Sequence, residues 1–236
     1  MPELPHGWLA DTIALYGRVF RRGAELAVRN WPIGVVIAGC LWGLTFLAIA
    51  LGGLGLGVAG GLVWTLLMTA CFSAWLALVG DAIRSGRVRW ADVPAAFGAY
   101  LGDLLTVGFL LWGIRLLAEI LVQVVPFVGI VLQLATIVFF NAVPELVYLG
   151  RHPPAELLAT SYRFIAENWI EWFPANFVLL VLLASLVFVP GDRFQVMGSL
   201  VAGAGLAFVL LVRGLLFVEL GSQGRRARAF QRRSGR

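Results

Sequence analysis

The sequence contains no lysine and only two histidines, His6 and His152. Two distant histidines are too few for a zinc site, and neither H-E-x-x-H nor G-x-S-x-G occurs, so no metal site and no catalytic residues are expected. The two cysteines, Cys40 and Cys71, lie within apolar runs, which argues against the disulfide framework of a secreted protein. Charged residues make up only 13% of the chain, against about a quarter in globular proteins. This shortage of charge excludes a large water-soluble domain.

Hydrophobic residues, by contrast, make up 60% of the 236 residues, and the mean hydropathy is +0.89. They fall into six runs, each long enough to cross about 30 Å of hydrocarbon. The sequence therefore predicts an all-α, polytopic membrane protein, with one helical membrane domain over residues 1–224 and a basic tail over residues 225–236. The predicted spans are 32–51, 62–80, 104–125, 127–149, 175–190 and 196–220. The N-terminal segment lacks the order of basic, apolar and small residues of a signal peptide, so we expect it to be retained.

Arginine is distributed unequally between the connections of these spans. Three connections are short and nearly uncharged: GGLGLGVAGG, the corner at Pro126, and PGDRF with Asp192 and Arg193. The connections on the other side contain Arg18, Arg21, Arg22, Arg29, Arg84, Arg87, Arg89, Arg151, Arg163 and the six arginines from Arg225 to Arg236. By the positive-inside rule, both termini are predicted to lie in the cytoplasm, with the spans in the bacterial inner membrane.

Two groups of these arginines are predicted to contact anionic lipid headgroups: Arg18, Arg21 and Arg22, and Arg225, Arg226 and Arg228. Basic clusters just inside a span attract anionic lipids by about 1 kcal/mol per charge. The same clusters would also fix the orientation of the spans, and the two roles are compatible. Arginine suits bidentate phosphate contacts, but a GC-rich genome explains the absence of lysine better than a chemical demand does. Membrane lipids are thus the expected partners, and nucleic acid is not.

The cytoplasmic segment before each pair of spans has a helical period. Residues 8–29 combine an apolar face that includes Ile13 with a charged face that includes Arg18. Residues 90–101 form an apolar stripe in a helix that Asp92 is expected to cap. Residues 153–169, PPAELLATSYRFIAENW, begin with prolines suited to a first helical turn. The sequence therefore predicts three cytoplasmic amphipathic helices at the membrane surface.

The order of amphipathic helix, span and span occurs three times. The second span of each unit ends in a similar tripeptide, LVG, YLG or ELG, so that Gly80, Gly150 and Gly221 are 70 and 71 residues apart. The first and third units also share an Asn-Trp pair, at 30–31 and 168–169, which the second unit lacks. The pattern suggests a three-fold repeat of this unit.

A family resemblance rests on the segment from SGRVRWADVPAAFGAY to SYRFIAENW. It contains, in order, a proline corner, a long span, a cytoplasmic helix with tyrosine and arginine, and the Asn-Trp pair. Over roughly residues 84–190 the chain resembles the YciC-like group of bacterial six-span membrane proteins, and the membrane domain attached to some glycerophosphodiester phosphodiesterases. The resemblance implies a helical protein of the bacterial inner membrane. It brings no catalytic residues, because the phosphodiesterase domain has no counterpart here.

Glycines give two further patterns. Gly55, Gly57 and Gly60 fit the G-x-G-x-x-G pattern of dinucleotide sites, but no strand precedes them and a span follows, so no cofactor is expected. Small residues four apart are instead predicted to bring helix backbones close together. These residues are Gly39 and Gly43 in the first span, and Ser199 and Gly203 in the sixth.

Two charges, Arg115 and Glu119, stand inside the third predicted span. If this span enters the membrane at Leu104, Arg115 lies about 16 Å deep, near the midplane. A bare charge there costs about 3 kcal/mol. Because the two residues are four apart they share a helix face and are predicted to pair. Gln133 in the next span is expected at a similar depth.

Arg213 in the sixth span is predicted to reach Asn141 and Glu145 in the fourth. Three interpretations of the intramembrane polar residues stay open: satisfied buried pairs that fix helix register, a polar path between spans three, four and six, or side chains that extend to an interface. We expect a non-enzymatic, lipid-interacting or scaffold component of the bacterial envelope. The alternative is a transporter or transporter subunit whose path these residues line.

Overall fold

The computed structural model describes residues 8–54, 57–150, 153–187 and 195–222. In chain order the elements are α1 (Trp8–Arg29), α2 (Trp31–Leu54), α3 (Gly57–Ser85), the 3₁₀ turn η1 (Trp90–Asp92), α4 (Val93–Ala96), α5 (Leu101–Val124), α6 (Pro126–Phe139), α7 (Val143–Leu149), α8 (Pro154–Val187) and α9 (Gln195–Ser222). Six segments are long and apolar enough to cross a membrane: Trp31–Gly53, Gly57–Ser85, Leu101–Val124, Pro126–Leu149, Glu156–Ser185 and Met197–Ser222. The prediction of an all-α, multi-pass membrane protein is therefore confirmed.

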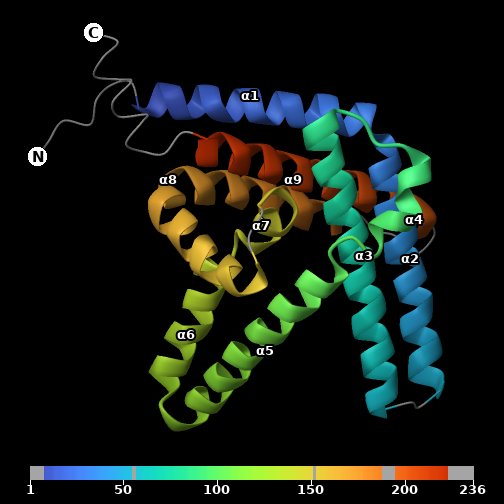
Figure 1. Ribbon diagram of the computed structural model, residues 1–236, viewed down its shortest axis with the longest axis vertical. Coiled ribbons are helices and arrows are strands. Elements are labelled where there is room, and N and C mark those ends of the chain that lie inside the picture. Colours follow the sequence, from blue (N-terminus) through green and yellow to red (C-terminus); the bar gives the residue numbers. More distant parts are fainter. Residues whose placement is uncertain (1–7, 55–56, 151–152, 188–194, 223–236) are drawn as a thin grey trace, which may run out of the picture.

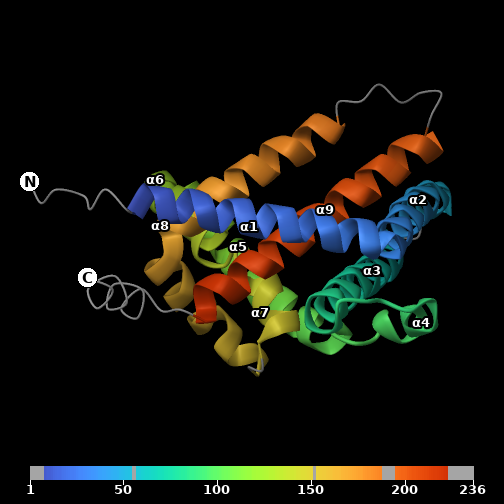
Figure 2. The same ribbon diagram turned by 90° about the horizontal axis from the view of Figure 1, so that it is seen from above.

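Two helical hairpins project in the same direction from the rest of the molecule (Figure 1). The α2–α3 and α5–α6 hairpins extend downward in this view and diverge from each other. The α8–α9 pair does not run alongside them. Both α9 and the second half of α8 lie across the upper ends of the hairpins, as the view from above also shows (Figure 2). The molecule thus consists of two projecting hairpins beneath a layer formed by α1, α8 and α9.

Helix α9 lies at the centre of the packed core. In its most apolar stretch of 18 residues, 50% of the residues are buried. This is the largest share among the six candidate spans in the described residues. The α1 helix packs on it, with the rings of Phe20 and Phe208 6.1 Å apart. The α8 helix packs on another side, where the rings of Phe164 and Phe217 are 4.6 Å apart. Helices from both ends of the sequence therefore meet at α9.

The backbones of two long helices, α2 and α9, approach each other closely. Gly203 of α9 faces the backbone of Gly34 and Ala38, and a β-carbon added to it would lie 2.8 Å from the amide nitrogen of Ala38. Gly203 was one of the small residues predicted to bring helices together. The same prediction is wrong for Gly39 and Gly43, because nothing lies within 4 Å of a β-carbon at either position in the described structure.

A turn between α6 and α7 divides the fourth predicted span into two helices. Pro144 explains the break, because proline has no N–H for a helical hydrogen bond and its ring clashes with the carbonyl four residues earlier. The break frees backbone carbonyls for other partners. The carbonyl of Phe139 accepts from Ser161 Oγ (2.7 Å), and that of Asn141 accepts from Arg213 Nη2 (2.8 Å).

The third amphipathic helix and the fifth span were predicted as separate elements, but they form one helix, α8. It continues through Pro174, which lies on the exposed side. The buried stripe formed by Ile165, Trp172 and Leu179 passes the proline without a gap. Because this packing holds both halves of α8 in place, the missing hydrogen bond at Pro174 does not end the helix.

The segment between α3 and α5 is helical over a shorter length than predicted. The side chain of Asp92 makes no capping hydrogen bond, so the predicted cap is wrong. Ser73 of α3 contacts the segment instead. Its hydroxyl donates to the carbonyl of Ala96 (3.1 Å) and accepts from the amide of Tyr100 (2.9 Å). Hydrogen bonds from a neighbouring helix thus stop α4 from continuing. The helical period of a sequence cannot predict such contacts.

The suggested repeat is visible only in part. Asn30 and Asn168 each donate Nδ2 to the carbonyl four residues earlier, at 3.0 Å. However, Asn30 lies between two helices, whereas Asn168 lies inside α8. In addition, α3 continues past Gly80 and ends at Ser85.

Helix α1 is amphipathic as predicted, but its buried stripe differs from the expected one. Val19 and Leu26 are buried, whereas Ile13, which was expected on the apolar face, is 68% exposed. The buried stripe packs against α9 rather than facing lipid, and the arginines of α1 lie on the exposed side. The amphipathic pattern of α1 therefore serves protein packing as well as any contact with the membrane surface.

Tyr16 connects α1 to α8, and this contact is expected to depend on pH. Its hydroxyl donates to the backbone carbonyl of Glu171 (2.7 Å). Burial, together with the charge of Glu171, raises the pKa of Tyr16 from 10.0 to about 12. Between these pH values Tyr16 is ionised in the unfolded chain but still protonated in the folded chain, so stability falls as the pH rises.

We therefore expect the thermal unfolding midpoint in detergent micelles to fall between pH 10 and about pH 12, and to fall less steeply in Tyr16→Phe. Tyr162→Phe is the control, because Tyr162 is an exposed tyrosine of α8. Equal slopes for Tyr16→Phe and the wild type would contradict the assignment.

Candidate functional site

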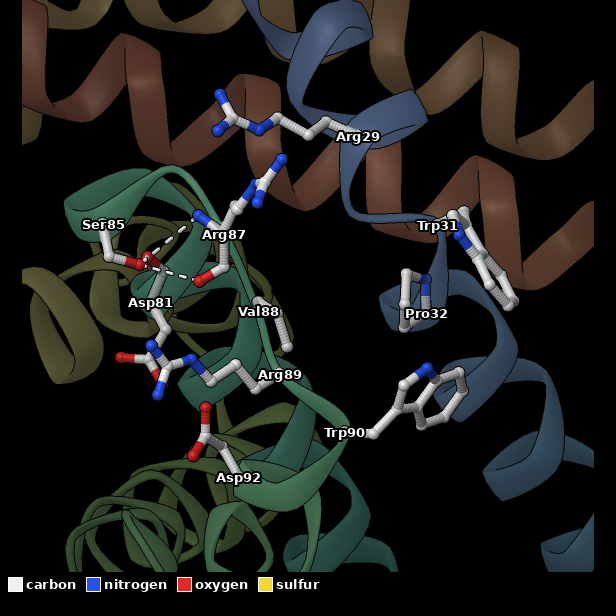
Figure 3. A pocket seen from close by; sticks show the side chains of 10 residues that line it. All are labelled: Arg29, Trp31, Pro32, Asp81, Ser85, Arg87, Val88, Arg89, Trp90 and Asp92. Carbon is white, nitrogen blue, oxygen red and sulfur yellow. Dashed lines mark hydrogen bonds between the residues drawn. The ribbon is translucent and has the colours of Figure 1, made fainter.

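A pocket of about 910 Å³ lies where α1, α2, α3 and the segment after α3 meet (Figure 3). Its walls come from two parts of the sequence that the fold brings together. The lining residues are Arg29, Trp31 and Pro32 from the α1–α2 junction, Asp81 and Ser85 from α3, and Arg87, Val88, Arg89, Trp90 and Asp92 from the segment that follows.

Asn30 holds these two parts together. It is 2% exposed and uses both atoms of its amide. Nδ2 donates to the carbonyls of Leu26 (3.0 Å) and Gly86 (3.3 Å), and Oδ1 accepts from the amide of Val88 (2.8 Å). One buried side chain therefore fixes the segment after α3 against the end of α1.

The turn after α3 directs the chain into the pocket wall. Gly86 has a φ of 75°, in the left-handed region that glycine adopts without a steric penalty. The hydroxyl of Ser85 lies 2.7 Å from the carbonyl oxygen of Asp81 and 2.8 Å from that of Arg87. In Figure 3 the side chain of Arg87 extends toward Arg29 across the pocket.

Positive charge predominates in the pocket. Three arginines and two aspartates line it, and one of the aspartates, Asp81, already pairs with Arg84 (Oδ1–Nη2 2.9 Å). In the described part of the chain, none of the three lining arginines has an ion-pair partner within 4.0 Å. All three are exposed. Their guanidinium groups are therefore available to an anion.

Two tryptophans stand beside these arginines. Trp31 is 60% exposed and Trp90 52% exposed, and their rings meet edge to face with centroids 5.7 Å apart. Tryptophan is enriched where a membrane protein passes through the level of the lipid headgroups, because its ring is apolar and its N–H is polar. The pocket thus combines groups that bind phosphate with groups suited to the membrane interface.

Three of the arginines predicted to contact headgroups do not line this pocket. Arg18, Arg21 and Arg22 are exposed on α1, and Arg21 Nε pairs with Glu25 Oε1 at 3.0 Å. The other predicted group, Arg225, Arg226 and Arg228, lies outside the described residues.

A second polar cluster lies inside the core, where Arg213 reaches Asn141 and Glu145 as predicted. Arg213 Nε and Nη2 donate to the two carboxylate oxygens of Glu145 at 2.6 and 3.0 Å. Two residues that were not predicted complete the cluster: Asn176 Oδ1 accepts from Nη1 (2.6 Å), and the guanidinium carbon lies 5.2 Å from the centroid of Trp172. The side chain of Arg213 is 15% exposed and that of Glu145 is 0% exposed. The cluster is a closed ion-pair network.

Arg115, Glu119 and Gln133 lie apart from this network, in a groove of about 610 Å³ between α5 and α6. Arg115 Nε donates to Glu119 Oε1 (2.8 Å), so the predicted pair is confirmed. The rest of the described chain does not bury this pair, because the side chains are 75% and 49% exposed. Spacing determines that two residues share a helix face, but it does not determine whether the protein covers that face.

Sequence reasoning did not select the pocket residues Arg29, Trp31, Arg87, Arg89 and Trp90 as a site. One signal was present in the sequence. Both RNW (29–31) and RW (89–90) place an arginine within two residues of a tryptophan, in a connection predicted to be cytoplasmic. Nothing in their spacing indicates that the two segments meet, since Asn30 makes that connection in the folded chain.

Comparisons of the chain with protein-family models, curated proteins and solved structures find no match. The resemblance seen over roughly residues 84–190 therefore stays a prediction. The geometry of the pocket and of the two polar clusters is the basis for a functional proposal.

Proposed function

We propose that the chain is a non-enzymatic, lipid-binding protein of the bacterial inner membrane, whose pocket binds the phosphate group of an anionic phospholipid. The observation that carries this proposal is a set of three arginines that have no ion-pair partner among the described residues and lie beside two exposed tryptophans. Guanidinium groups form short, bidentate hydrogen bonds to phosphate oxygens. Arginine and tryptophan together thus match a charged headgroup attached to an apolar body.

The position of the pocket supports this proposal. It lies at the ends of α1, α2 and α3, on the side of the chain that has the arginine-rich connections. By the positive-inside rule this side faces the cytoplasm, where the anionic leaflet has a negative surface potential. We therefore propose cytoplasmic termini and a lipid from the inner leaflet. Membership of the YciC-like group would agree with this location and is part of the proposal.

The test is retention of lipid by the double variant Arg87→Gln, Arg89→Gln in discs that contain phosphatidylglycerol and phosphatidylethanolamine. Native mass spectrometry gives the number and class of the lipids that stay bound. Two lost charges correspond to about 2 kcal/mol, or roughly 30-fold weaker binding of phosphatidylglycerol. The preference of the protein for phosphatidylglycerol over phosphatidylethanolamine should fall as well.

The matched control is Arg18→Gln, Arg22→Gln, which removes two exposed arginines of α1 that lie outside the pocket. Its tightly bound phosphatidylglycerol should persist. If both double variants lose the lipid equally, the arginines act only through the overall charge of the protein. If neither loses it, the pocket is not the lipid site.

The alternative function, transport along a polar path, has less support. The six candidate residues do not form one line but two separate groups, one around Arg213 and one around Arg115. Around Arg213, the donors are used by Glu145, Asn141 and Asn176, which leaves this group closed rather than open to a solute. Uptake that depends on Arg115 but not on the pocket arginines would favour the alternative.

A further inference from the structure

The α5–α6 hairpin is the part of the membrane region that the rest of the chain covers least. The most apolar 18-residue stretch of each candidate span in the described residues can be compared by its buried share. The shares are smallest for α5 (11%) and α6–α7 (17%). The two helices pack tightly on each other near the corner, where Gly129 contacts Val122. Figure 1 shows that they extend away from the other helices. Away from its contacts with α3 and α8, the outer faces of this hairpin therefore have no partner within the described chain.

The exposed pair of Arg115 and Glu119 lies in the second half of α5, the first helix of this hairpin. Arg115 is 14 residues from the start of α5 at Leu101 and nine from its end at Val124, or about 21 and 14 Å along the helix axis. Glu119 is five residues from that end, or about 8 Å, but Arg115 is too far from either end for its guanidinium to reach water easily. Arg115 therefore stands at a depth where lipid chains would surround an isolated copy.

The pair leaves hydrogen-bonding groups unused. A guanidinium has five N–H donors, and the donor that bonds to Glu119 is Nε–H of Arg115. Gln133, in the same groove, makes no hydrogen bond with any described residue. By contrast, four other side chains surround Arg213 in the core. Because polar groups left open to hydrocarbon are costly, the exposed pair needs a polar partner from outside the chain.

A second copy of the chain is a suitable partner, because it presents the same two charges. Each copy presents one cation and one anion, one helical turn apart, with no net charge. In a two-fold dimer whose axis is normal to the membrane, α5 of each copy runs parallel to α5 of the other and like residues lie at the same depth. Long side chains one turn apart can then cross-pair, as the flanking charges of parallel coiled coils do.

We propose that the α5–α6 hairpin is the interface of a homodimer in which Arg115 of each copy pairs with Glu119 of the other. Gln133 lies at the edge of this interface and hydrogen-bonds to the paired charges. The groove between α5 and α6 receives side chains of the second copy. The dimer thereby removes two ion pairs from contact with lipid.

The test uses two charge-reversed chains with different affinity tags, extracted in native-membrane discs. R115E presents two acids and E119R presents two bases, so each variant repels itself. Co-capture of two wild-type chains is expected to exceed that of two R115E chains, or of two E119R chains, by at least about tenfold. Co-expression of R115E with E119R should restore co-capture to near the wild-type level.

The mixed pair contains the same chains as the failed pairs, so its recovery also shows that both variants insert and fold. If a charge-reversed chain does not accumulate in the membrane, the double variant R115L/E119L provides a second readout. It is expected to reach normal membrane levels and to show reduced co-capture. Reversal of the exposed Arg21–Glu25 pair of α1, in R21E and E25R, is the control and should leave co-capture unchanged.

Three results would overturn the proposal. The wild type could be monomeric in the discs. Co-expression of R115E with E119R could fail to restore co-capture, which would mean that Arg115 and Glu119 pair only within one chain. Finally, co-capture could be unaffected while bound lipid or solute is lost from the groove, which would assign the pair to a ligand.

Discussion

Replacing Arg213 with methionine is expected to lower the free energy of unfolding by about 3–5 kcal/mol, because the Glu145 carboxylate stays buried without its partner. That carboxylate is 0% exposed and takes two hydrogen bonds from the guanidinium. Arg213→Lys should not rescue it, since a single ammonium cannot reach the acceptors on Asn141, Glu145 and Asn176 together. The measurement is the unfolding transition in mixed detergent micelles.

The double variant Arg213→Met, Glu145→Leu provides the internal test of this explanation. Removing both charges of a buried pair is often close to neutral, so the double variant should recover most of the loss. Arg21→Met is the matched control, because the Arg21–Glu25 pair is exposed and such pairs contribute less than about 1 kcal/mol. A double variant as unstable as Arg213→Met would show that the charge of Glu145 is not the cause.

Replacing Gly203 with valine is expected to cost about 3 kcal/mol, at the upper end for overpacked contacts. Its β-carbon would meet the backbone oxygen of Gly34, and it would lie 2.8 Å from the amide nitrogen and 2.9 Å from the β-carbon of Ala38. These are mainly backbone atoms, so no side-chain rotation can relieve the contact. The helices α2 and α9 would have to separate.

Gly198→Val is the matched control for this prediction. It makes the same change in the same helix, at a position where nothing lies within 4 Å of a β-carbon. The difference between the two variants isolates the contact with α2 from the general effect of valine in a helix. If both variants unfold at the same detergent composition, then α2 and α9 do not pack as closely as described.

Hydropathy predicted most of the fold because hydrocarbon imposes a length on every span. The first span was predicted at 32–51 and the structure has Trp31–Gly53. Errors arose where packing rather than solvent decides the backbone. Pro144 breaks the fourth span but Pro174 does not break α8, because a buried stripe of side chains continues past Pro174. A local sequence pattern does not distinguish these two prolines.

The candidate sites were predicted less completely, for two physical reasons. Contacts within one helix follow from spacing, so the Arg115–Glu119 pair could be predicted, but its exposure depends on which face the other helices cover. Contacts between distant segments depend on the fold. The pocket exists because Asn30 joins the end of α1 to Gly86 and Val88, and no periodic pattern records that connection.

The central position of α9 has a consequence for how the protein is made. The contacts of α1 and α2 with α9 at Phe208 and Gly203 cannot form until the last described helix has been synthesised. Until then Glu145 in α7 also lacks Arg213, its ion-pair partner in α9. The earlier helices therefore lack these contacts, and the Glu145 carboxylate lacks its counter-charge, until α9 has been made.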